Sequence, residues 1–124
     1  NELMHLHDTL YHGDVIVCWA GSFGIDATIF DTPVINPDFP MDTHEPRIHS
    51  AQEHYRFTHY KKALSYGGLR LVHSKGELAL WVKRYIENPA TDRAGRKSLV
   101  AHEVQFTDGL AGQRIGDFIR SAMP

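Results

Sequence analysis

The chain has 124 residues, of which 42% are hydrophobic and 23% charged, and its formal net charge is -2. This length suffices for one hydrophobic core and is too short for two, so we expect one globular domain over residues 1–124. The near balance of acids and bases lacks the basic field that binds phosphate backbones, which argues against nucleic acid as a partner. A lone cysteine, Cys18, excludes a disulfide framework and favours a reducing, cytoplasmic setting.

The chain also lacks targeting features. No stretch approaches the roughly 18 apolar residues that a membrane-spanning helix needs. The start, NELMHLHDTL, has neither an initiator Met nor the pattern of a secretory signal. We therefore expect no transmembrane segment, and we expect the chain to be a fragment cut or processed from a longer one.

The first third of the chain predicts a β-loop-α-β unit. Apolar residues at positions 3, 6 and 10 predict an amphipathic helix that ends at Gly13. The continuous apolar run over residues 14–20 is typical of a strand buried on both faces, as in parallel sheets. Residues 25–30 fit a short helix, and TPVIN at 32–36 predicts a second strand.

The middle of the chain predicts a long loop, a helix and a third strand. Three prolines within residues 37–46 predict an irregular loop. A helix is expected over residues 51–65, ended by Gly67 and Gly68, and LRLVH at 69–73 predicts the next strand.

The last third of the chain predicts helices. Ser74 and Glu77 form a capping box before a helix whose core stripe comprises Leu78, Trp81, Val82, Tyr85 and Ile86. We expect Thr91 or Asp92 to cap the next helix, and Asp108 to cap a final helix with an apolar face. This order predicts an α/β fold with a Rossmann-like parallel sheet, flanking helices and a helical carboxyl-terminal tail.

The stretch GSFG follows the first strand, at the edge of a parallel sheet where ligands usually bind. Gly21 and Gly24 let a ligand approach the backbone, Ser22 adds a hydroxyl, and free amides at a helix start favour phosphate. Asp26, expected in the first helical turn, could accept hydrogen bonds from a ribose. The same residues also suit an ordinary helix cap that binds nothing.

The order of segments resembles the carboxyl-terminal half of a GT-B glycosyltransferase, near the CDP-glycerol glycerophosphotransferases and the capsule and lipopolysaccharide transferases. The matching pieces are DVIVCWAGSFGIDATIFDTPVIN, HY before a Gly-Gly turn, LRLVHSKGEL, YIENPATDRAGRKSLV and FTDGLAGQRIGDFI. By this resemblance Ser22, Phe23 and Gly24 would bind the donor's phosphates and Asp26 its ribose. Arg114 would face back on the domain.

The resemblance implies the donor-binding half of an enzyme of surface-polysaccharide biosynthesis, at the inner face of the membrane. The nucleotide-activated sugar or glycerol is then a substrate, and no cofactor is expected. The partner would be an amino-terminal GT-B domain that carries the acceptor site, so the isolated domain would not turn over. Two alternatives stay open: half of a nucleotide-sugar 2-epimerase, and a non-catalytic Rossmann-like binding domain.

Other polar residues yield weaker hypotheses. His44, His49, His54 and His59 recur every five residues, a step of 140 degrees on a helix, so they do not share a face and no metal site is expected. Asp38 follows the second strand and is a candidate cleft residue, as is His59 with its neighbour Tyr60. Solvated or capping roles for these residues remain the alternative.

Overall fold

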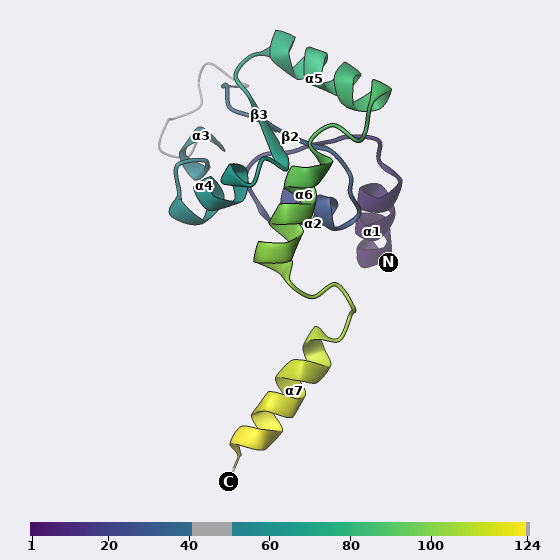
Figure 1. Cartoon of the computed structure of the whole chain (residues 1–124), viewed down its shortest axis with the longest axis vertical. Coiled ribbons are helices and arrows are strands. Elements are labelled where there is room, and N and C mark those ends of the chain that lie inside the picture. The colour runs from purple at the N-terminus through teal and green to yellow at the C-terminus, as the bar shows by residue number, and fades with distance from the viewer. Residues whose placement is uncertain (41–50, 124) are drawn as a thin grey trace.

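The computed structural model describes residues 1–40 and 51–123 as a small α/β body with a helical arm (Figure 1). The elements, in chain order, are α1 (Glu2–His12), β1 (Ile16–Val17), α2 (Ser22–Ile29), β2 (Val34–Pro37), α3 (Ala51–His54), α4 (Thr58–Ser65), β3 (Leu69–Val72), α5 (Lys75–Glu87), α6 (Arg93–Leu99), the π-helical turn η2 (Val100–Val104) and α7 (Ala111–Ala122).

The three strands form one parallel sheet in the order β1-β2-β3, with β2 in the centre. Ile16 pairs with Val34, and Val34 pairs with Leu69. The predicted α/β class with a parallel sheet and flanking helices is therefore confirmed. All three strands end at the same edge, which is the edge where the Gly-Ser stretch begins.

Helices cover both faces of the sheet, and alternate residues of β2 divide the core between them. Val34 faces a cluster that includes Leu10 of α1, Ala27 of α2, Ala63 of α4 and Leu99 at the end of α6. Ile35 faces the other way, toward Tyr85 of α5. The strict alternation is what a pleated strand imposes, and both residues are fully buried.

The first strand is shorter and more open than the sequence predicts. Only Ile16 and Val17 pair with β2, and Val17 is 46% exposed. The expectation of burial on both faces is wrong here because β1 is an edge strand, and α5 packs against β2 and the cluster of Ile35 and Val72. An apolar run predicts that a strand is buried, but it does not predict how much of the strand the neighbouring helix α5 covers.

The helix predicted over residues 51–65 is two helices, α3 and α4, separated at residues 55–57. Phe57 adopts an extended conformation with ψ of 140 degrees before α4 begins. On a continuous helix Tyr55 and Tyr60 would lie 140 degrees apart. The break lets both rings turn toward the sheet, where their centroids are 5.7 Å apart.

Helix α5 begins as predicted, because the Ser74 hydroxyl accepts from the Glu77 amide at 3.1 Å. The Glu77 carboxylate accepts in return from the amide of His73 at 2.8 Å. Tyr85 is fully buried, as its position on the stripe predicts, but Ile86 is 60% exposed. Ile86 therefore lies at the border of the stripe, outside the core.

Helix α6 crosses the turn before β3 at backbone distance. A Cβ built on Gly95 would lie 2.2 Å from the carbonyl carbon of Gly67, and one on Gly68 would lie 2.7 Å from the Cα of Arg96. Gly67 has a φ of 75 degrees, which also favours glycine. The Gly67-Gly68 pair therefore does more than end α4: it admits α6 against the sheet.

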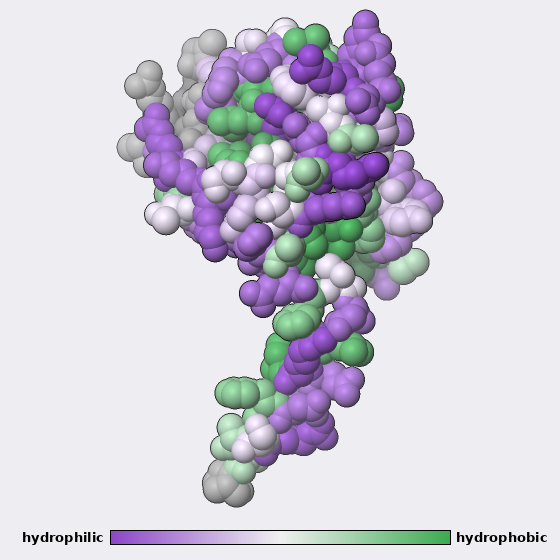
Figure 2. Space-filling view, in the orientation of Figure 1, coloured by the Kyte–Doolittle hydropathy of each residue, from purple (hydrophilic) through white to green (hydrophobic). Residues whose placement is uncertain are grey.

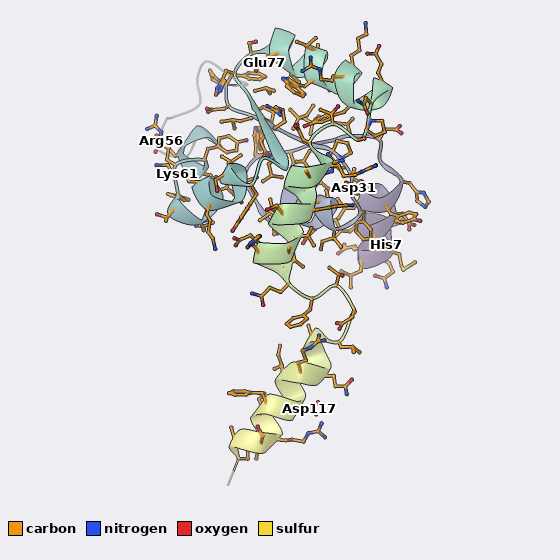
Figure 3. All side chains as sticks on the ribbon, viewed as in Figure 1. His7, Asp31, Arg56, Lys61, Glu77 and Asp117 are labelled. Atoms are coloured by element: carbon orange, nitrogen blue, oxygen red, sulfur yellow. The ribbon has the colours of Figure 1, made fainter. Side chains whose placement is uncertain are left out.

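Arg96 fills the space beside this crossing with a fully buried guanidinium. It donates to the carbonyls of Thr91 and Pro89 at 2.8 and 2.7 Å, and to the carboxylate of Asp31 at 2.8 Å. Asp31 directly follows the end of α2 and lies beside α6 (Figure 3). Each nitrogen of the buried guanidinium thus has a hydrogen-bond partner, as a buried charge requires.

Asp92 has a different role from the predicted cap. It occupies the N-cap position of α6 in a left-handed conformation, yet its side chain makes no capping bond. Its carboxylate instead accepts from Arg70 at 2.6 Å and from the Tyr85 hydroxyl at 2.7 Å. Asp92 therefore joins β3 and α5 to the start of α6.

Helix α7 projects from the body, and Figure 2 shows its apolar side chains open to solvent. Ile115, Phe118 and Ile119 of the predicted apolar face are all exposed, Phe118 by 71%. Asp108 accepts from the amide of Leu110 at 3.1 Å and pairs with Arg114. The resemblance implied that Arg114 faces back on the domain. Arg114 instead pairs with Asp108, just before α7.

The crossing of α6 makes Gly95 irreplaceable. We expect Gly95→Ala to lower the free energy of unfolding by about 3 kcal/mol, because the added methyl meets backbone that cannot move aside. Urea unfolding followed by circular dichroism measures this. Gly76→Ala in α5, where a Cβ has nothing nearer than 4.0 Å, is the matched control and should not destabilise the protein. Equal stability of both variants would contradict the packing argument.

The Asp31 ion pairs predict a pH-dependent stability. Burial alone would raise the pKa of Asp31, but hydrogen bonds and charges from Arg96 and Arg93 outweigh it and lower that pKa. The stabilisation of the folded state by the charged Asp31 is therefore fully present above its unfolded-state pKa of about 4. It is lost as the pH falls through the lower folded-state pKa.

Asp31→Asn tests this, since Asn tolerates the φ of 61 degrees found at this position. The variant should be less stable than the parent at pH 7, and the difference should shrink below about pH 4. Asp117→Asn, which removes an exposed ion pair of α7, should show no such pH dependence. A constant difference for Asp31→Asn across pH would contradict the role of its charge.

Candidate functional site

The candidate site lies at the edge where β1 and β2 end and α2 begins. Helix α2 starts at Ser22, three residues before the predicted Ile25, with Gly21 as an extended N-cap whose φ is 169 degrees. Gly21 has no side chain with which to cap the helix. The amides of Ser22, Phe23 and Gly24 therefore have no partner within the helix, which is the arrangement that binds anions.

Gly24 is buried in a tight contact between α2 and the sheet. A Cβ at this position would lie 3.1 Å from the Cys18 sulfur and 3.3 Å from a methyl of Val34. The early helix start follows from this contact, because a residue without a side chain lets the first turn pack directly on β1 and β2. Gly24 thus has a packing role beside any ligand role, and a bulky substitution there is not a clean probe of binding.

A buried polar network holds the strand ends in place. Asn36, which is 0% exposed, donates to the carbonyl of Cys18 at 2.7 Å, and its own oxygen accepts from the Tyr60 hydroxyl at 3.2 Å. The Tyr55 hydroxyl donates to the carbonyl of Pro37 at 2.9 Å. Tyr60, a cleft candidate from the sequence, is thus buried under the helix start and supports it.

The groups of this network are uncharged near neutral pH. Burial raises the pKa of Cys18 to about 11, although a hydrogen bond from Asn36 opposes the shift. Burial also raises the pKa of Tyr60 to about 12, and interaction with the Gly21 backbone lowers it slightly. With these pKa values the Cys18 thiol and the Tyr60 phenol both stay protonated at pH 7. They therefore position the loop and do not act as acids or bases.

Asp26 lies in the second turn of α2, because the helix begins earlier than predicted. Its side chain is partly buried, and burial raises its pKa. Among residues 1–40 and 51–123, no Lys, Arg or His forms an ion pair with it. Burial of a carboxylate without a cation is unfavourable, so Asp26 is a candidate to receive donors from a ligand.

The two other candidates lie on different elements. Asp38 follows β2, where its amide donates to the carbonyl of Val72 at 2.7 Å and its carboxylate lies 3.3 Å from Nδ1 of His73. His59 is exposed in the first turn of α4, beside the ring of Phe57. The structure therefore leaves Asp38 at the candidate edge and places His59 on the outer surface of α4. The rest of the predicted 37–46 loop, from residue 41, lies outside the described residues.

An apolar hollow of about 290 Å³ opens beside this edge, lined by Val17, Cys18, Trp19 and Pro37. Trp19 is 52% exposed, although the sequence places it at the end of an apolar run. The sequence also gave no reason to single out Asn36. An Asn that ends an apolar strand, and a Trp immediately before a Gly-Ser turn, are the signals that mark these two residues.

The described residues 1–40 and 51–123 hold no cluster of three or more His, Cys, Asp or Glu side chains that could bind a metal ion. His44 and His49 of the five-residue series fall outside them. Within the same ranges, no helix combines the length and apolar character required to cross a bilayer.

Comparison with known proteins adds no relative. No protein-family model, curated protein or solved structure matches the chain.

The polar network predicts unequal effects for two tyrosines. Tyr60→Phe should lower the free energy of unfolding by about 1–2 kcal/mol, because it leaves the buried oxygen of Asn36 without its donor. The matched control is Tyr66→Phe, whose hydroxyl bonds to Glu103 at the exposed surface, and it should leave the urea midpoint unchanged. Equal losses would mean that the network does not hold the helix start.

Proposed function

We propose that the chain is the nucleotide-donor-binding half of a GT-B glycosyltransferase or glycerophosphotransferase of surface-polysaccharide biosynthesis. The motifs of the segment from DVIVCWA to TPVIN support this proposal, as does the parallel sheet, at whose carboxyl-terminal edge ligands usually bind. The donor is a substrate in this proposal, so no cofactor is required. An amino-terminal domain would supply the acceptor site and close the cleft.

One observation carries the proposal: α2 begins after a glycine N-cap, and one turn later carries a partly buried carboxylate, Asp26, that forms no ion pair with the described residues. The amides of Ser22, Phe23 and Gly24 suit a diphosphate, and the helix dipole adds to their attraction. Asp26 then suits the hydroxyls of the adjoining ribose. An ordinary helix start without a ligand would explain the free amides, but it would not explain the partly buried carboxylate of Asp26.

The proposed chemistry is transfer without a metal ion. In glycosyl transfer the bond between the sugar carbon and the oxygen of the β-phosphate breaks, and negative charge accumulates on the leaving nucleoside diphosphate. In glycerophosphate transfer the bond between the two phosphates breaks, and the charge accumulates on the leaving nucleoside monophosphate. Fixed amide donors at the start of α2 stabilise this charge without reorganising. The described residues around this helix start contribute neutral donors, and the acceptor's proton would go to a base on the other half of the enzyme.

The test is an amide-shift NMR titration of the chain with CDP, UDP and GDP. We expect shifts concentrated over residues 20–26. Asp26→Asn should weaken the best nucleotide about tenfold, because it removes a charged acceptor for the ribose, and should leave inorganic pyrophosphate affected far less. Because burial raises the pKa of Asp26, its contribution should fade at a higher pH than for an ordinary Asp as the solution is acidified.

Asp117→Asn, on the distant arm, is the matched control and should bind like the parent. Absence of localised shifts at millimolar nucleotide would refute donor binding by this chain and favour a cap. Equal loss of nucleotide and pyrophosphate in Asp26→Asn would remove the ribose role alone.

A further inference from the structure

The hollow beside Trp19 is a second feature of the candidate edge that the proposed function does not use. Its lining is apolar and includes the ends of β1 and β2, and the Trp19 ring is half exposed at its border. A large aromatic side chain left open to solvent loses the hydrophobic gain of burial. Its position beside a pocket suits contact with a ligand.

The order of the features along the chain matches the order of groups in a nucleotide-activated donor. Asp26, for the ribose, lies one turn into α2, and the phosphate-binding amides lie at its start. Trp19 comes two residues before the N-cap Gly21, on the strand side of the same amides. Only Ala20 separates Trp19 from Gly21 in the chain, so the transferred group of a diphosphate bound at the helix start, with its ribose toward Asp26, lies within reach of Trp19.

The chemistry of the hollow favours a ring over a charged or flexible group. Of the lining residues that the structure describes, only Cys18 carries an ionisable side chain, and that thiol is neutral at pH 7. A pyranose offers an apolar C–H face that packs flat on an indole, with its hydroxyls left at the solvent side. An acyclic glycerol has no such face and would gain little from the Trp19 ring.

We propose that Trp19 selects a sugar ring as the transferred group of the donor, by stacking against it in the hollow formed with Val17, Cys18 and Pro37. This inference rests on the proposed function, because it requires a diphosphate at the start of α2. It decides between the two donor classes that the family resemblance leaves open, and makes the chain part of a sugar transferase.

The experiment compares each nucleoside diphosphate with its activated donor: UDP with UDP-glucose, GDP with GDP-mannose, and CDP with CDP-glycerol. At least one sugar donor should bind the chain about threefold to tenfold more tightly than its diphosphate, the range expected for one aromatic contact. CDP-glycerol should show no gain over CDP. In a Trp81→Phe background, the fluorescence of Trp19 should respond to that sugar donor and not to the diphosphate alone.

Two variants assign the gain to the ring. Trp19→Ala should remove the advantage of the sugar donor while the diphosphate keeps its affinity, and Trp19→Phe should restore much of it. Circular dichroism checks that both remain folded, which we expect because Trp19 is half exposed.

Each other outcome overturns the inference in a distinguishable way. If diphosphates bind at residues 20–26 but no sugar donor binds more tightly, or if Trp19→Ala weakens diphosphate and sugar donor equally, the hollow does not receive a sugar and the proposed function stands. A gain with CDP-glycerol equal to that with a sugar would reject ring selection. If no diphosphate binds at all, both the inference and the proposed function fail.

Discussion

The structure depends on one buried cation. Arg96 has no exposed side-chain surface, and each of its three side-chain nitrogens donates a hydrogen bond, two to backbone carbonyls and one to the carboxylate of Asp31. Removing the Asp31 carboxylate leaves the Arg96 charge in the protein interior without a counter-ion, and such a loss typically costs about 3–5 kcal/mol. This single side chain joins the end of α2 to the segment that leads into α6, and these two segments are about sixty residues apart in the chain.

That junction also determines how the candidate site is presented. Helix α2 is held at its carboxyl end by the Asp31 pairs and at its start by the contact of Gly24 with Cys18 and Val34. A helix fixed at both ends cannot tilt, so its first amides point at a constant place beyond the sheet. Binding of an anion by amides needs this kind of fixed geometry, because each donor contributes only when it is already aimed at the ligand.

Local rules predicted the local parts of this fold. The capping box of Ser74 and Glu77 and the apolar stripe of α5 identify that helix because every contact they need lies within one or two turns. The strands that begin at Val34 and Leu69 follow from β-branched and apolar runs in the same way. The parallel sheet then follows from alternation of strands and helices.

Most failures of prediction involve partners on other helices or strands. The break between α3 and α4 exists because Tyr55 and Tyr60 both reach the ends of β2. Asp92 is drawn from its cap by Arg70 and Tyr85, and α2 starts early because Gly24 fits against the sheet. The candidate residues Ser22 and Asp26 could be chosen from their sequence pattern, whereas the roles of Trp19 and Asn36 become clear only once the ends of β1 and β2 are seen together.

The arm α7 also has a consequence for local unfolding. A helix of 12 residues is marginally stable alone in water, and the apolar face of α7 is exposed, so α7 is a separate cooperative unit that unfolds at little free-energy cost. Backbone amides in the sheet, in contrast, exchange their hydrogens only when the whole body unfolds.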